Sequence, residues 1–144
     1  MNPAYLEEMI TISLSSGGCI KLDLKTFSEE LSYALCGVSN QRTLNNFRMV
    51  AERIKERPIP PLLIASTLLV PGYVDEKEVE AISNFIADTD PSIPYVLLAF
   101  YPHFYLSDLP ATSKSHAFKC KDIAEKKGLS NVRIGNLHLL SDGY

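Results

Sequence analysis

Two charged side chains stand two residues apart in the segment IKLDLK, and this spacing could serve a ligand. Asp23 and Lys25 would lie on the same face of a short strand, because side chains alternate along β structure. A carboxylate beside an amine suits a ligand that carries both hydroxyl groups and a carboxylate. The alternative is a salt bridge at the protein surface, worth about 0–1 kcal/mol. Residue chemistry alone leaves both interpretations open.

A second candidate is the turn VPGYVD, which follows a long apolar run. Pro71 fixes one backbone torsion and Gly72 permits a turn that other residues disfavour, so main-chain groups after Val70 could contact a ligand directly. An ordinary strand-to-helix turn with Asp75 as the helix cap would explain the same residues. Phosphate is not the expected ligand, because the chain has neither Gly-x-Gly-x-x-Gly nor Gly-x-x-x-x-Gly-Lys.

A third candidate is the aromatic segment FYPHFY. Tyr101 and His103 could stack on an aromatic ring or present a patch to a partner; the alternative is a core rim in which His103 is hydrogen-bonded. The histidines share no metal-ligand spacing, so no metal site is predicted. Neither Gly-x-Ser-x-Gly nor His-Glu-x-x-His occurs, and no residue is predicted to be catalytic.

The elements that must position these residues alternate between strands and helices. Capping residues and apolar spacing predict helices over about 3–16, 28–37, 43–55, 75–89 and 114–127, with strands over 19–25, 62–70, 95–100 and 131–136. This alternation predicts parallel strands with outer helices, and the run LLIASTLLV predicts a strand covered on both faces. The polar candidates all lie at the carboxyl ends of strands, at the edge where open sheets and barrels bind ligands.

Composition limits the class of protein. The 144 residues are 46% hydrophobic and 22% charged, as expected for one soluble globular domain. The net charge of −3 does not favour nucleic acid. No apolar run is long enough for a membrane span and no signal pattern is present, so we expect a cytoplasmic protein. The three cysteines suggest neither disulfides nor a metal site, and we expect them reduced and mostly buried.

Four segments, taken in order, resemble a known family: IKLDLKTFSEELSYALCGVSNQRTL, TLLVPGYVDEKEVEAISNFIA, IPYVLLAFYPHFYLSDLPAT and VRIGN. They are similar to the carboxyl-terminal half of radical S-adenosylmethionine (radical SAM) enzymes, above all pyruvate formate-lyase activating enzymes and their archaeal relatives. The family fold is a partial (β/α)6 TIM-like barrel. The resemblance therefore implies that residues 1–144 form the last strands of such a barrel as a single domain.

The resemblance also implies roles for individual residues. Asp23 and Lys25 would contact the methionyl and ribose part of S-adenosylmethionine, and the backbone from Val70 to Gly72 would lie against the adenine. A family histidine touches the nucleoside from the next loop. Depending on where a gap is placed, Tyr101 or His103 stands at that position here.

The family's cluster motif is absent from this sequence. Radical SAM enzymes of this kind hold a 4Fe-4S cluster with Cys-x3-Cys-x2-Cys, and neither this spacing nor the family's Gly-Gly-Glu-type segment occurs. We expect the cluster only in an absent amino-terminal half, and no cleavage of S-adenosylmethionine by this chain alone. The chain would form the nucleoside side of a site for 5′-deoxyadenosyl radical chemistry, on a protein or small-molecule substrate.

Partners and alternatives follow from the same expectation. A half-barrel needs a complementing amino-terminal half-barrel chain, or self-association, to cover its open edges and inner face. The alternative function is a non-catalytic half-barrel interaction module that has lost the chemistry. A third possibility is an unrelated open-sheet nucleotide binder, which a doubly wound sheet with helices on both faces would favour.

Overall fold

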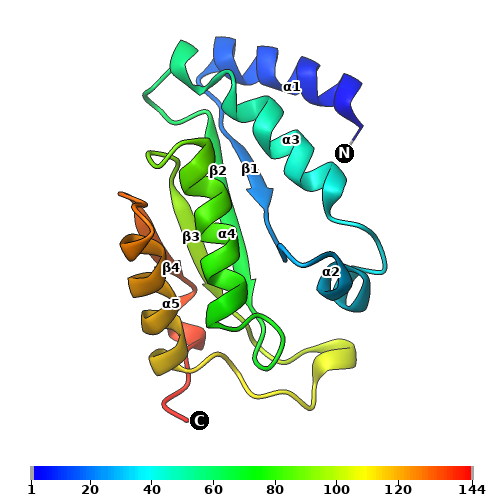
Figure 1. Cartoon of the computed structure of the whole chain (residues 1–144), viewed down its shortest axis with the longest axis vertical. Coiled ribbons are helices and arrows are strands. Elements are labelled where there is room, and N and C mark those ends of the chain that lie inside the picture. The colour runs from blue at the N-terminus through cyan, green and yellow to red at the C-terminus, as the bar shows by residue number, and fades with distance from the viewer. Residues whose placement is uncertain (1, 144) are drawn as a thin grey trace.

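A computed structural model describes residues 2–143 and contains four strands and five α-helices in alternating order (Figure 1). The helix expected over 43–55 begins earlier and ends sooner than its apolar spacing suggested. The elements are α1 (Pro3–Ser16), β1 (Ile20–Asp23), α2 (Glu29–Cys36), α3 (Gln41–Ala51), η1 (Ile54–Glu56), β2 (Leu63–Leu69), α4 (Glu76–Thr89), β3 (Tyr95–Ala99), η2 (Phe104–Leu106), α5 (Lys114–Lys126), β4 (Val132–Gly135) and η3 (Leu137–Leu139), where η marks a 3-10 turn.

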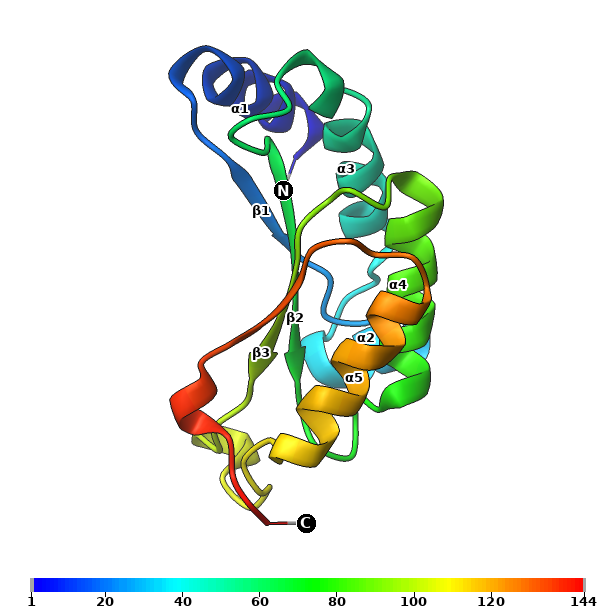
Figure 2. The same ribbon diagram turned by 90° about the vertical axis from the view of Figure 1, so that its left-hand side faces the viewer.

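The four strands form one parallel sheet in the order β1-β2-β3-β4. Each strand pairs with the next one in the chain, so every new strand is added at the same edge of the sheet. Helices α3, α4 and α5 consequently lie on the same side of the sheet (Figure 2). This is the winding of a barrel wall, and it confirms the predicted fold class of parallel strands with outer helices in a partial TIM-like barrel. A doubly wound sheet would carry helices on both faces, so that alternative is excluded.

Local capping residues set most helix ends where the sequence predicted them. The side chains of Asn2, Ser28 and Asp75 accept hydrogen bonds from backbone N–H groups in the first turns of α1, α2 and α4. Gly17 and Gly37 end α1 and α2 with φ values of +77° and +71°, a conformation that glycine adopts without a Cβ penalty.

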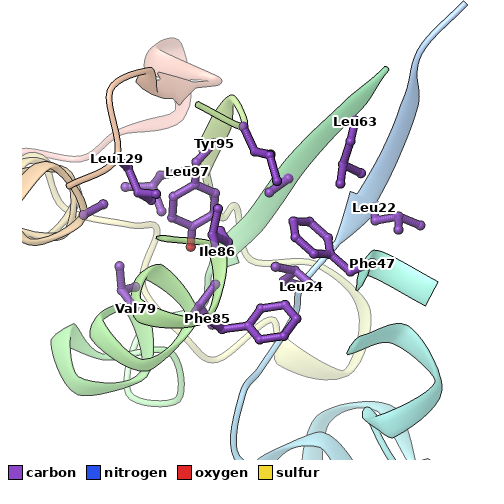
Figure 3. Close-up of a cluster of buried hydrophobic side chains, with 14 of the residues drawn as sticks. Leu22, Leu24, Phe47, Leu63, Val79, Phe85, Ile86, Tyr95, Leu97 and Leu129 are labelled. Atoms are coloured by element: carbon purple, nitrogen blue, oxygen red, sulfur yellow. The ribbon is translucent and has the colours of Figure 1, made fainter. Parts of the chain in front are cut away.

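The main core lies between the sheet and the helices (Figure 3). Phe47 of α3 and Phe85 of α4 meet with ring centroids 5.4 Å apart, and both face the buried side of the sheet. Tyr95 of β3 is fully buried among them. Burying such large apolar side chains contributes about 1.5–3 kcal/mol each, so this layer fixes the helices against the strands.

The opposite face of the sheet is only partly covered, which corrects the expectation that β2 would be covered on both faces. Leu68 on this face is 38% exposed, and the apolar side chains beside it are half-buried. Periodicity could not show this, because an apolar inner barrel face and a second helical layer both produce a continuous apolar run. The inward residues are Lys21, Asp23, Ile64, Ser66, Leu68, Val96, Leu98 and Arg133.

The cysteines also differ from expectation. Cys120 is buried, whereas Cys19 and Cys36 are exposed, so the general preference of free thiols for the core holds for one of the three. Cys19 directly precedes β1, and Cys36 is the last residue of α2. Among residues 2–143, no helix is long and apolar enough to cross a membrane.

Candidate functional site

The polar candidates gather at one edge of the sheet because all four strands run in the same direction. The carboxyl ends of the strands point to the lower edge in Figure 1, and the loops that follow them lie there. Asp23 ends β1, the Val70–Gly72 turn follows β2, and the loop with Tyr101 and His103 follows β3. The prediction that these segments share an edge is therefore confirmed.

Asp23 and Lys25 both project away from the core, as their spacing predicted. Leu22, Leu24 and Thr26 between and beside them are buried. The Asp23 carboxylate accepts a hydrogen bond from the Ser66 hydroxyl on β2 and lies 3.8 Å from the Lys21 ammonium. That ion pair is half-exposed, so it contributes at most about 1 kcal/mol. The partners of Asp23 are thus Lys21 and Ser66 and not Lys25. Asp23 and Lys25 line a pocket together.

This pocket has a volume of about 140 Å³ and lies between the end of β1 and the α2–α3 connection. Asp23 and Lys25 contribute its charges, and Ser39, Asn40 and Cys36 add polar groups. Sequence reasoning missed the residues from the α2–α3 connection, because their turn pattern carries no ligand signal of its own. Hydrogen bonds from Asn40 Nδ2 to the Thr26 and Phe27 carbonyls hold this connection beside the end of β1.

A buried polar chain supports the backbone where β1 ends. The Tyr95 hydroxyl donates to Thr67 Oγ1 over 2.8 Å, and the Thr67 hydroxyl donates to the Leu24 carbonyl over 2.7 Å. Burial raises the pKa of the Tyr95 phenol, so this hydroxyl keeps its proton and remains a donor. The Leu24 N–H donates to the Ser66 carbonyl over 2.8 Å. Both backbone polar groups of Leu24 are therefore hydrogen-bonded to β2.

The Val70–Gly72 turn has the backbone geometry that its sequence predicted. Val70 and Pro71 are buried, while Gly72 is exposed with φ +77°. A Cβ built on Gly72 would meet no atom within 4 Å, so the turn requires glycine for its backbone torsion and leaves open space beside it. Asp75 caps α4 by accepting from the Glu78 N–H over 2.9 Å, as expected.

Thr112 joins the carboxyl ends of β2 and β3. Its hydroxyl donates to the Leu69 carbonyl and accepts from the Phe100 N–H, each over 2.7 Å. The β2–β3 ladder begins with the Ala65 N–H donating to the Pro94 carbonyl. If the same alternating pattern continued to the carboxyl ends of the strands, its last bond would join the Phe100 N–H directly to the Leu69 carbonyl. The inserted hydroxyl therefore holds the two strand ends apart where the Gly72 turn and the aromatic loop begin.

The aromatic loop presents its side chains to solvent. Tyr101, Phe104 and Tyr105 are 60%, 78% and 92% exposed. The His103 and Phe104 rings stack at 5.7 Å between centroids, and Phe104 has φ +57°, which is uncommon for a bulky residue. This arrangement matches the exposed patch rather than the core rim with a hydrogen-bonded His103.

The candidate residues do not all line one pocket. Pro71 and Gly72 line a second pocket, of about 310 Å³, between the amino ends of α4 and α5. His116 on its wall places Nε2 3.0 Å from the Val74 carbonyl and Nδ1 3.6 Å from the Glu76 carboxylate. Cys120 lies behind His116, and burial raises the pKa of its thiol to about 12, which makes it a poor nucleophile. Tyr101 and His103 lie in neither of these two pockets.

Comparison with known proteins defines the fold first. No protein-family model matches the chain. Its structure is similar to the crystal structure of a domain of pyruvate-formate lyase-activating enzyme from Bacteroides vulgatus, with a TM-score of 0.68, covering 90% of this chain and 74% of that domain chain at 21% sequence identity. At this identity the likeness establishes the half-barrel fold.

A curated relative connects the sequence to the same class. Isethionate sulfite-lyase activating enzyme from Desulfovibrio desulfuricans is 38% identical over 80 residues, or 55% of this chain. The matched part is 24% of that enzyme, so the chain corresponds to about a quarter of the relative's length. Both matches are activating enzymes, and the resemblance to part of a radical SAM enzyme of the pyruvate formate-lyase activating type is thereby confirmed.

Proposed function

We propose that this chain forms the nucleoside side of the S-adenosylmethionine site of a radical SAM activating enzyme. The observation that carries the proposal is the gathering of the IKLDLK and VPGYVD segments at one carboxyl edge, on a fold shared with an activating-enzyme domain. Asp23 and Lys25 would bind the methionyl and ribose part, and the backbone from Val70 to Gly72 would accommodate the adenine.

The chain's own residues fit the nucleoside and do not fit the iron-sulfur cluster. Gly72 exposes backbone beside open space, and Lys25 supplies an exposed cation for a carboxylate. Among the described residues, no group of three or more His, Cys, Asp or Glu side chains could hold a metal ion. In a complete enzyme, S-adenosylmethionine supplies the chemistry of a 5′-deoxyadenosyl radical; here the chain would bind and orient the nucleoside.

A complementing half-barrel that carries the cluster cysteines is the partner of this proposal, and a protein is the proposed substrate class. Leu68 on the half-open inner face and Tyr105 in the aromatic loop are apolar surfaces that a partner would cover. The same exposure favours the second candidate function, a non-catalytic interaction module. Binding of S-adenosylmethionine distinguishes the two candidates.

The test is a titration of the isotope-labelled chain with S-adenosylmethionine at millimolar concentrations, followed by NMR. We expect shifts at Asp23, Lys25 and Gly72. Lys25→Ala should weaken binding about tenfold, because it removes a charged contact. The control Lys55→Ala changes an exposed lysine at the amino end of the sheet and should have no effect. Shifts that avoid the carboxyl edge would refute the proposal. A chain that associates with itself or with a partner half-barrel but does not bind S-adenosylmethionine would support the interaction module.

A further inference from the structure

We infer that Glu78 and Asn40 are positioning residues that fix the backbone carrying Lys25 and join it to the helix that follows the Val70–Gly72 turn. This inference rests on the proposed function, because it concerns how the same site is held in shape. Neither side chain needs to touch the ligand for this role.

Glu78 binds across the molecule. Its Oε1 accepts hydrogen bonds from the N–H groups of Phe27 and Ser28, the latter over 2.9 Å. The spacing of Asp75 and Glu78 predicts a capping box, in which the glutamate would return to the backbone N–H of its own cap. Only the Asp75 half of that box forms, and the glutamate serves the β1–α2 loop instead. Hydrogen bonds from two N–H groups to a carboxylate are among the stronger protein contacts.

Asn40 holds the same loop from the opposite side. Its Nδ2 donates to the Phe27 carbonyl over 2.7 Å and to the Thr26 carbonyl over 3.2 Å, and the residue is only 6% exposed. Both contacts need donors, so they fix which end of the amide faces the loop. Phe27 is therefore held at its N–H by Glu78 and at its carbonyl by Asn40.

These contacts hold the backbone on both sides of the exposed Lys25 side chain. Leu24 before it is bound to β2 through its N–H and carbonyl, and the residues after it are held by Asn40 and Glu78. A ligand then meets a lysine whose backbone is already ordered, which lowers the entropy lost on binding. Glu78 lies within one turn of Asp75, the cap of α4. Its hydrogen bonds to Phe27 and Ser28 therefore connect the β1–α2 loop to the start of α4.

The test measures amide hydrogen exchange and S-adenosylmethionine affinity in the same samples. Glu78→Ala should speed exchange at Phe27 and Ser28 about tenfold and weaken S-adenosylmethionine binding about tenfold, as expected for the loss of hydrogen bonds to a charged group. Glu78→Gln keeps an acceptor oxygen and should stay within about threefold of wild type in both. The control Glu80→Ala, also on α4, removes a carboxylate that pairs with Lys127 and should change neither value.

A second variant tests the opposite side of the loop. Asn40→Asp keeps the shape of the side chain but cannot donate to the Thr26 and Phe27 carbonyls, and should also weaken S-adenosylmethionine binding about tenfold. Wild-type affinity in Glu78→Ala, or in Asn40→Asp if the first variant does not fold, overturns the positioning role. Unchanged exchange at Phe27 and Ser28 in Glu78→Ala overturns the Glu78 contact itself. If the wild-type chain binds no S-adenosylmethionine, the proposed function fails first and the positioning role fails with it.

Discussion

Replacing Thr112 separates the role of its hydroxyl from the role of its shape. Thr112→Val keeps the shape and removes the group that bridges the Leu69 carbonyl and the Phe100 N–H. Both partners are at least nine-tenths buried, so water cannot replace the lost contacts. An unsatisfied buried backbone group costs about 1–3 kcal/mol, and two such groups should lower the free energy of unfolding by about 2–6 kcal/mol.

Thr112→Ser provides the matched control, because it keeps the hydroxyl and removes one methyl group. Its cost should be about 1 kcal/mol, the transfer free energy of one buried carbon. Urea denaturation followed by far-UV circular dichroism gives both values by linear extrapolation. If Thr112→Val is as stable as Thr112→Ser, the strand ends close to form the direct ladder bond, and the reasoning that the hydroxyl must hold them apart is wrong.

Three further predictions concern single residues. The Cys120 thiol has a pKa of about 12 when folded and near 9 when unfolded. Stability should therefore be complete below pH 9 and fall as the pH rises toward 12, by about 1 kcal/mol at pH 10. Cys120→Ala should remove most of this loss in urea denaturation at pH 8 and 10, with the remainder due to the buried Tyr95 phenol, whose pKa is also raised, while Cys36→Ala should keep all of it. Asp75→Ala should cost about 1 kcal/mol through the lost cap of α4, measured in urea at pH 7; no change would mean that water replaces the cap. Gly72→Ala should cost about 1 kcal/mol through its positive φ alone, and thermal unfolding that shows a much larger loss would indicate an unrecognised contact.

The parts of the fold that sequence predicted are those fixed by neighbouring residues. The caps at Asn2, Ser28 and Asp75 depend on contacts two or three positions away, so the pattern contains the whole interaction. The direction of the strands followed from crossover length. These local features are sufficient to place the candidate segments on one edge of the sheet.

The parts that sequence missed depend on residues distant in the chain. The contact of Glu78 with Phe27 spans 51 positions, and the local pattern around Glu78 has a satisfactory explanation as a capping box. The half-open face that includes Leu68 was missed for a related reason. An apolar side chain does not encode whether its cover comes from a helix, from a ligand or from another chain.

The sequential order of the sheet has a consequence for its assembly. Each strand pairs with one that has already been synthesised, so the sheet can extend strand by strand from β1 as the chain emerges. Ile20 and Leu24 direct their N–H groups to β2, so the backbone of Lys21 and Asp23 faces the outer edge at every stage. A strand added at that edge would bind the backbone of the residue whose carboxylate lines the candidate pocket.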